Sequence, residues 1–209
     1  MAASPFPSRS VGWLAIAIGA VTLLGIVSIV LFFVVGGVFG PLNDVCNGIE
    51  AILSAALAWA LYPLHRAQSA RLGRFALCAA WVGALVAIVG SALIIFDITG
   101  WYLAALYTMV GYALIGIWLF GLNYAALRSF LWPRRLAQLG LFAAVCMAIG
   151  FLAGPGMLGG VDDVGAAPWF VNIGLLGSMG WMFLYPIWSF WLGRLLISNS
   201  AMMPVATHA

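Results

Sequence analysis

The fold is decided by the stretch from Val11 to Phe39, which reads VGWLAIAIGAVTLLGIVSIVLFFVVGGVF and contains no charged residue. About 20 predominantly apolar residues suffice to cross the hydrocarbon core of a bilayer as a helix. The backbone must be helical there, because lipid offers it no hydrogen-bond partners. The stretch therefore predicts a membrane span. It is too long for a cleaved signal peptide, whose apolar region has about 7–15 residues.

The rest of the chain has the same character. Of its 209 residues 66% are hydrophobic and 6% are charged, whereas a soluble domain has about 25% charged residues. No segment shows the polar–apolar alternation of a transmembrane barrel. We therefore predict one all-α domain covering residues 1–209, a bundle of six transmembrane helices. The expected spans are residues 11–39, 45–64, 75–96, 101–127, 136–153 and 169–197.

Basic and acidic residues fall in different connections between these spans. The basic residues are Arg9, Arg66, Arg71, Arg74, Arg128, Arg134, Arg135 and Arg194, which lie in the N-terminal tail, the second and fourth connections and the end of the last span. The acidic residues are Asp44, Glu50, Asp97, Asp162 and Asp163, in or beside the other three connections. Arginine-rich loops stay in the cytoplasm, so we expect both termini there.

Polar residues recur at helical spacing near the start of the second predicted span. Asn43, Asn47, Glu50 and Ser54 are four, three and four residues apart, which places them on one helix face. We regard this face, together with the outer acids, as a candidate vestibule or cation site. The set is Asn43, Asp44, Asn47, Glu50, Ser54, Asp97, Asp162 and Asp163. Its oxygen ligands would suit calcium or magnesium, although the sequence leaves metal binding open.

The same residues have a structural interpretation. Asn47 and Glu50 match a variant of the capping box, in which two side chains satisfy the free N–H groups at a helix N-terminus. The second span is expected to begin near Val45, so this interpretation is the stronger one. Both alternatives stay open at the level of sequence.

Several functional classes are disfavoured. With these span boundaries no ionisable residue lies near the centre of a span, as proton pumps, proton-coupled carriers and voltage sensors require. No cofactor is evident, because the chain has no lysine for a retinal Schiff base and only His65 lies near a span as a haem ligand. No catalytic signature such as a P-loop or a zinc-protease motif occurs, and nothing indicates a nucleic-acid partner.

Small residues within the spans predict close helix packing. The glycines concerned are Gly36, Gly40, Gly150, Gly154, Gly174, Gly177 and Gly180, in pairs four apart or a run three apart. The connection from Gly154 to Pro168 is also rich in glycine, and the sequence does not decide whether it acts as a lid.

Short strings resemble a known family. Phe120-Gly121-Leu122-Asn123, Leu127-Arg128-Ser129 and Trp132-Pro133-Arg134-Arg135-Leu136 are similar to the junction between spans four and five in a family of six-span bacterial inner-membrane proteins. That family is defined only as a domain of unknown function. The resemblance implies a location in a bacterial inner membrane and transfers no active site.

Three functions remain. The first is a non-catalytic subunit or helix-packing component of a membrane assembly, with other subunits or copies of itself as partners beside the lipid bilayer. The second is a small transporter or channel for a neutral or cationic solute. The third is a lipid-acting membrane enzyme, for which the sequence offers almost no positive sign. The direction in which the Asn43–Ser54 face points separates the first two.

Overall fold

The computed structural model describes residues 9–201, apart from the side chains of residues 67, 68 and 199–201. This part of the chain is helical and contains no strand. Six helices are long and apolar enough to cross a membrane, which confirms the predicted fold class. The six spans are Arg9–Val35, Phe39–Arg66, Ala70–Ile95, Trp101–Ser129, Arg134–Leu158 and Trp169–Ser198.

The first four spans are single helices, and the last two are interrupted. The single helices are α1 (Arg9–Val35), α2 (Phe39–Gln68), α3 (Ala70–Ile95) and α4 (Trp101–Ser129). The fifth span consists of α5 (Arg134–Ala148), the 3-10 helix η1 (Ile149–Ala153) and α6 (Gly154–Leu158). The sixth consists of α7 (Trp169–Gly174), the 3-10 turn η2 (Leu175–Gly177), the π-helical stretch η3 (Gly180–Leu184) and α8 (Tyr185–Ala201).

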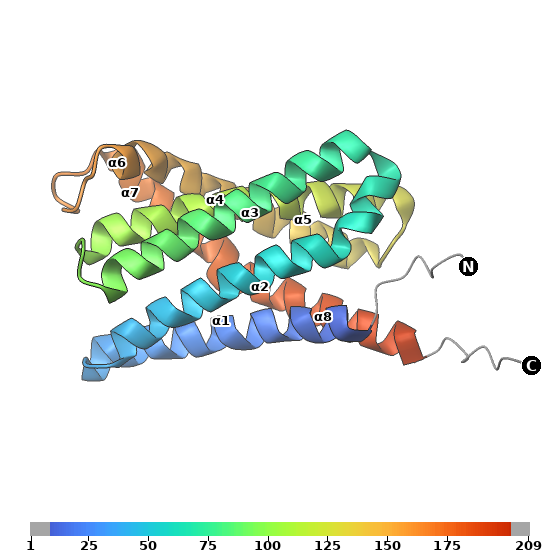
Figure 1. The fold of residues 1–209 in the computed structure, drawn as a ribbon, viewed down its shortest axis with the longest axis horizontal. Helices are drawn as coiled ribbons and strands as arrows, with labels where there is room; N and C mark the ends of the chain where they lie inside the picture. The colour runs from blue at the N-terminus through green and yellow to red at the C-terminus, as the bar shows by residue number, and fades with distance from the viewer. Residues whose placement is uncertain (1–8, 202–209) are drawn as a thin grey trace, which may run out of the picture.

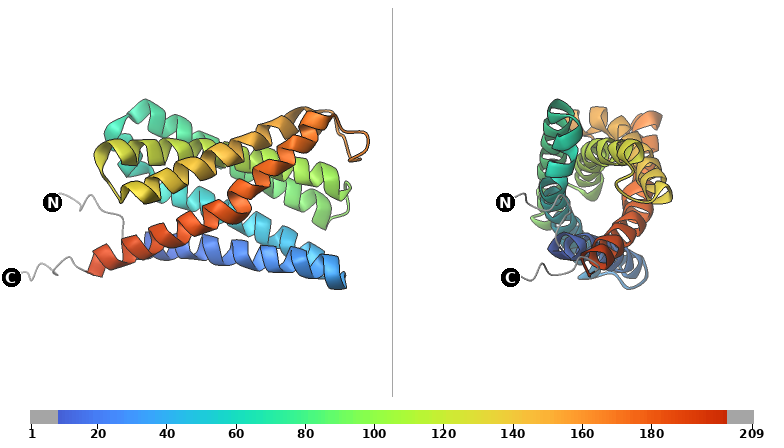
Figure 2. Two further views of the ribbon diagram at one scale, coloured as in Figure 1. Left: turned by 180° about the vertical axis from the view of Figure 1, so that it is seen from behind. Right: turned by 90° about the vertical axis from the view of Figure 1, so that its right-hand side faces the viewer.

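The spans form a ring (Figures 1 and 2). Each packs against the next in chain order, and the last span closes the ring by contacting both α5 and α1. The last span crosses the bundle diagonally: α7 lies beside η1, whereas α8 lies along α1. Side chains that point into this ring are shielded from lipid by the other spans.

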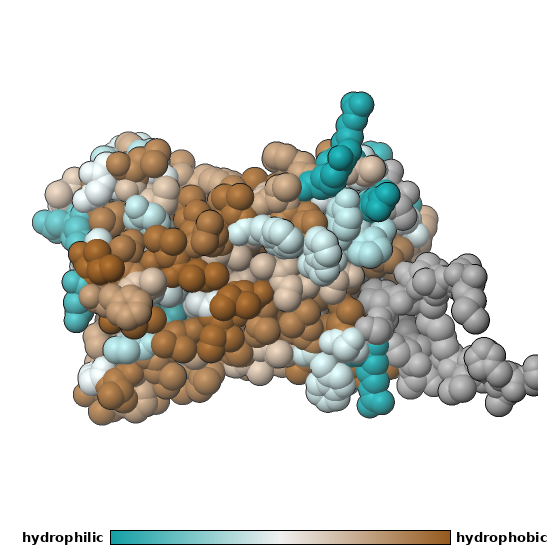
Figure 3. All heavy atoms as spheres, in the orientation of Figure 1, coloured by the Kyte–Doolittle hydropathy of each residue, from teal (hydrophilic) through white to brown (hydrophobic). Residues whose placement is uncertain are grey.

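The two ends of the bundle differ in charge. All the arginines lie at or near the end where α1 begins and α8 ends, which we call the arginine end. Asp97, Asp162 and Asp163 lie at the opposite, acidic end. Figure 3 shows apolar side chains over the middle of the visible face and polar ones toward both ends. This is the distribution expected of a chain that crosses a bilayer.

The first connection lies earlier in the chain than the sequence suggested. Gly36 and Gly37 form the turn, with φ of 78° and 67°, a conformation that glycine adopts at no steric cost. Helix α2 then begins at Phe39 rather than near Val45, so Pro41 falls in its first turn. Proline is tolerated there, because the N–H groups of a first turn have no partner within the helix.

Proline also accounts for the π-helical stretch in the last span. Pro186 directly follows Tyr185 and carries no N–H to bond the carbonyl of Met182, four residues earlier. The regular α-helical bonding pattern therefore breaks at η3. Stretches of this kind occur frequently at functional sites.

Glycines hold the two interrupted spans together. A Cβ added at Gly174, Gly177 or Gly180 would lie 2.6–2.7 Å from a backbone nitrogen of the fifth span. A Cβ at Gly150 would lie 2.7 Å from the carbonyl oxygen of Met109 in α4. A Cβ at Gly40 would lie 3.0 Å from the ring of Phe32, a looser contact with a side chain. Gly36 and Gly154 do not have the predicted packing role, because a Cβ there would meet no atom within 4 Å. Gly36 serves the turn instead.

Candidate functional site

Glu50 lies inside the helix ring near the middle of its candidate membrane span. Its side chain is 1% exposed, and its span, Phe39–Arg66, is centred between Ile52 and Leu53. It lies eleven residues beyond Phe39, which corresponds to about 16 Å of helix. The expectation that no ionisable residue lies near the centre of a span is therefore wrong. Its cause is the misplaced start of α2.

The capping interpretation fails for the same reason. Asn47 lies about two turns after the start of helix α2, and Glu50 lies about three turns after it. The actual N-cap residue is Val38, whose side chain makes no capping hydrogen bond. Neither Asn47 nor Glu50 can therefore satisfy the first free N–H groups of the helix.

The polar face of α2 points into the ring. Asn47 is 7% exposed and Ser54 is fully buried, while Asn43 and Asp44, closer to the acidic end, are half-buried. Asn43 Nδ2 donates to Asp44 Oδ1 at 3.4 Å. A Cβ at Gly25 of α1 would approach Asn43 Oδ1 and Asn47 Oδ1 to within 4 Å. The missing side chain at Gly25 thus leaves room for both amides between α1 and α2.

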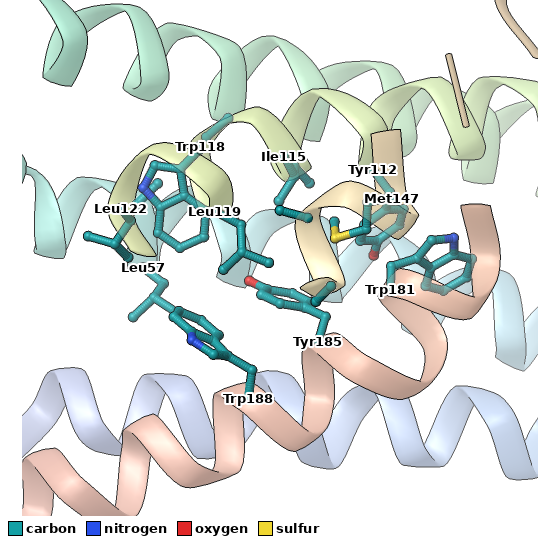
Figure 4. Packing of buried hydrophobic residues seen from close by; sticks show 14 of the residues in the cluster. Leu57, Tyr112, Ile115, Trp118, Leu119, Leu122, Met147, Trp181, Tyr185 and Trp188 are labelled. Carbon is teal, nitrogen blue, oxygen red and sulfur yellow. The ribbon is translucent and has the colours of Figure 1, made fainter. Parts of the chain in front are cut away.

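Three other helices surround Glu50 with hydroxyl groups. Thr22 of α1 and Tyr112 of α4 lie beside its carboxylate, and Tyr185 of α8 lies close enough for an electrostatic interaction. Each of these residues sits near the middle of its own span. Figure 4 shows Tyr112 and Tyr185 pointing into the interior of the bundle.

The hydrogens of these hydroxyl groups are directed elsewhere. Thr22 Oγ1 donates to the carbonyl of Ile18 at 2.9 Å, and Tyr112 Oη donates to the carbonyl of Asn47 at 3.1 Å. Tyr185 Oη donates to Ser54 Oγ at 3.0 Å. Among the described residues neither oxygen of Glu50 therefore has a hydrogen-bond partner. A buried charged group in this state is costly and calls for an explanation.

Aromatic rings enclose the same region. The rings of Tyr112 and Trp181 stack with centroids 4.4 Å apart, and Tyr185 stacks on Trp188 at 5.8 Å. Trp188 Nε1 donates to Asn123 Oδ1 at 3.0 Å, toward the arginine end. Tyr185 and Trp188 point into the bundle from the last span (Figure 4), and Ser189 beside them in sequence is also buried.

The outer acids do not join Glu50. Asp162 accepts from the N–H groups of Gly100 and, at 3.0 Å, Leu103, so it caps α4 from the fifth connection. Asp163 accepts from Gly165 within its own loop at 2.8 Å. Asp97 is exposed in a turn, with φ of 52°. The predicted cation site combining these acids with α2 is not formed, and no cluster of three or more acidic, histidine or cysteine ligands occurs in the described part of the chain.

The connection from Gly154 to Pro168 is held by hydrogen bonds to the rest of the bundle at two points. Besides the contact of Asp162 with α4, Asn172 Nδ2 donates to the carbonyl of Val164 at 3.5 Å. Asn172 Oδ1 in turn accepts from Tyr102 Oη at 2.7 Å. The connection therefore packs against the acidic ends of α4 and α7 in this structure.

No pattern in the sequence assigned Thr22, Tyr112 or Tyr185 to the site. Isolated hydroxyl residues in apolar spans do not show which way they point. One feature of the sequence could have indicated Tyr185. It directly precedes Pro186 within an apolar span, and a proline at such a position marks an interruption of the helix.

The comparisons with other proteins add no homologue. No family model matches the chain, and no curated protein or solved structure matches it. The resemblance of the span-four-to-five junction to a six-span bacterial family therefore stays a prediction.

Proposed function

We propose that this protein is a small membrane transporter for a monovalent cation, with Glu50 as the residue that holds the positive charge at mid-membrane. The supporting observation is the carboxylate of Glu50, buried in the ring with neither oxygen hydrogen-bonded among the described residues. Ionisable residues inside a membrane are costly and typically mark ion pathways or proton relays. A bound cation would supply the partner that the carboxylate lacks.

The interrupted last span supports this proposal. Discontinuous helices near the bilayer midplane form the substrate and ion sites of many transporters. Here the π-helical stretch η3 ends directly before Tyr185, whose hydroxyl bonds Ser54, one turn from Glu50. A change in the bonding pattern of η3 would therefore move a group next to the site.

Polar side chains also approach Glu50 from both ends. Asn43 and Asn47 lie on the side of the acidic end, and Ser54 and Ser189 on the side of the arginine end. Asn47, Ser54 and Ser189 are buried in the ring. Such a row offers oxygen atoms to an ion at successive depths.

The first sequence hypothesis, a non-catalytic subunit, was supported by an empty membrane centre, by the small-residue faces of the helices and by the lack of a soluble domain. Glu50 removes the first of these supports. The exposed apolar faces of the bundle need no protein partner, because lipid covers such faces in a spanning protein. We further propose, from the arginine distribution and the family resemblance, a bacterial inner membrane with the arginine end in the cytoplasm.

Uptake into proteoliposomes tests the function. We expect purified protein to carry Na⁺, K⁺ or methylammonium inward along an imposed gradient, and Glu50→Gln to reduce uptake to the level of protein-free liposomes. Glutamine keeps the size of the side chain and removes its charge. The matched control is Asp97→Asn, which neutralises an exposed acid at a turn position with positive φ, where asparagine is well tolerated.

Equal uptake by the wild type and Glu50→Gln would contradict the proposed role of Glu50. Absence of uptake for all three cations in the wild type, with correctly folded protein, would contradict the proposed function. Loss of uptake in Asp97→Asn as well would show that surface charge, rather than the buried site, controls the flux.

A further inference from the structure

The charge of Glu50 has no counter-charge in the described part of the chain. The groups that face it are Thr22 from α1, Tyr112 from α4, Tyr185 from α8, and Cys46 on its own helix. None of these carries a positive charge. Helix α3 contributes Ser91, which lies near Gly48, toward the acidic end. All arginines lie at the arginine end.

The surrounding hydroxyl groups bring oxygen atoms close to Glu50. Thr22 and Tyr112 donate to the carbonyls of Ile18 and Asn47, which compete with the carboxylate for their single hydrogens. Where those hydrogens go to the carbonyls, the lone pairs of the hydroxyl oxygens repel the carboxylate. They become favourable when a positive centre lies between them, either a proton on the carboxyl group or a bound ion.

The composition of the site selects a small monovalent ion. One carboxylate balances one positive charge, and a divalent ion would leave a net charge at mid-membrane. Neutral hydroxyl and carbonyl oxygens are ligands of hard cations. A larger organic cation would favour free aromatic faces, yet Tyr112 and Trp181 cover one face of each other by stacking at 4.4 Å.

We propose that Glu50 holds a proton and an alkali-metal ion in alternation, so that the transporter exchanges Na⁺ or K⁺ for H⁺. This inference rests on the proposed function and names its substrates. In the protonated form the carboxyl group donates its hydrogen to Thr22 Oγ1 or Tyr112 Oη. When the metal ion enters, the proton leaves to water on the side to which the site is open, and the ion binds among the same oxygens. The site is neutral in both forms, and no further reactant is needed.

Proteoliposomes with a pH-sensitive dye trapped inside test the exchange. A gradient of Na⁺ or K⁺ directed inward should make the lumen alkaline in the wild type and in Asp97→Asn, and should leave lumenal pH unchanged in Glu50→Gln. Choline of the same concentration serves as the control cation. Uptake of radioactive Na⁺ is recorded in the same preparation, so that coupling and transport are measured separately.

The outcomes separate the two proposals. Cation uptake that depends on Glu50 without any change in lumenal pH would overturn the exchange and leave the transporter intact. A pH change that needs no alkali-metal ion would overturn the exchange in favour of a proton path. Absence of both cation uptake and pH change would overturn the proposed function itself.

Infrared difference spectroscopy gives a readout that does not depend on transport. Adding Na⁺ or K⁺ to wild-type protein at constant pH should remove the carbonyl band of a protonated carboxyl group, and Glu50→Gln should lack this difference band. In Asp97→Asn the same carbonyl band should also disappear when Na⁺ or K⁺ is added. Persistence of the protonated carboxyl band in wild-type protein at saturating Na⁺ and K⁺ would overturn the alternation.

Discussion

Two buried polar residues of the ring, Glu50 and Asn123, differ in how well they are satisfied. Asn123 accepts from Trp188 Nε1 at 3.0 Å and donates to the carbonyl of Leu119 at 2.8 Å. Glu50, equally buried, has no such partner among the described residues. A satisfied buried polar group contributes to stability, whereas an unsatisfied one reduces it. The contrast points to a structural role for Asn123 and a functional one for Glu50.

Glu50→Met should therefore stabilise the protein. Methionine has a similar volume, and it replaces a polar group that lacks partners with an apolar side chain. We expect the free energy of unfolding to rise by about 1 kcal/mol, measured as thermal unfolding in detergent free of Na⁺ and K⁺, while cation uptake is lost.

The control for Glu50→Met is Asn123→Leu. This substitution deprives Trp188 Nε1 of its acceptor and should lower the free energy of unfolding by about 1–3 kcal/mol. If Glu50→Met lowered stability as much as Asn123→Leu, Glu50 would have a structural partner, and its assignment as an ion site would be wrong.

At the level of elements, glycine contacts make the last two spans fit closely. A Cβ at Gly177 would lie 2.6 Å from the backbone nitrogen of Gly150, where no flexible side chain can move aside. Gly177→Ala must separate the two spans, and we expect a loss of about 1–3 kcal/mol of stability. The measurement is the unfolding midpoint together with the yield of monodisperse protein.

Gly154→Ala is the matched control for this prediction. Gly154 is helical, and a Cβ there meets no atom within 4 Å outside its chain neighbours. Alanine there should cost clearly less than Gly177→Ala, because its Cβ crowds only the ring of Pro155, and glycine itself costs about 0.5–1 kcal/mol in a helix. Equal losses in the two variants would show that the contact with Gly150 does not hold the spans together.

The elements also show what the sequence could and could not predict. Hydropathy predicted six spans, because the length and apolar character of each segment suffice for that. It misplaced the start of α2, because the expected spans leave Gly40-Pro41 between two helices, although proline is compatible with a first turn. The expected end of the fifth span at residue 153 is wrong in the same way, since that span continues through Gly154-Pro155 to Leu158.

This shift of boundaries changed the interpretation of the site. Counted from Val45, Glu50 is a cap residue near the surface; counted from Phe39, it lies at mid-membrane. The spacing of Asn43, Asn47, Glu50 and Ser54 correctly predicted one shared face. The partners from α1, α4 and α8 depend on how the ring closes, which no local pattern in the sequence encodes.

At the scale of the whole molecule, the charge distribution and the site together imply a direction. Asn43 and Asp44 connect Glu50 with the acidic end, whereas Ser54, Tyr185 and Ser189 lead toward the arginine end. If the arginine end faces the cytoplasm, ions from outside meet the half-buried Asn43 and Asp44 first. Protons from the cytoplasm would reach Glu50 past Ser189 and Tyr185.

Labelling of single cysteines tests this orientation. In a parent without Cys46, Cys78 and Cys146, Asp163→Cys introduces a thiol at the acidic end, and Arg135→Cys introduces one at the arginine end. Both positions are exposed. A membrane-impermeant maleimide should label Asp163→Cys in intact cells, and Arg135→Cys only after the membrane is opened.

The reverse pattern would place the arginine end outside, contrary to the positive-inside rule. The amides of Asn43 and Asn47 would then face the cytoplasm, and the Ser189 side would face the outside.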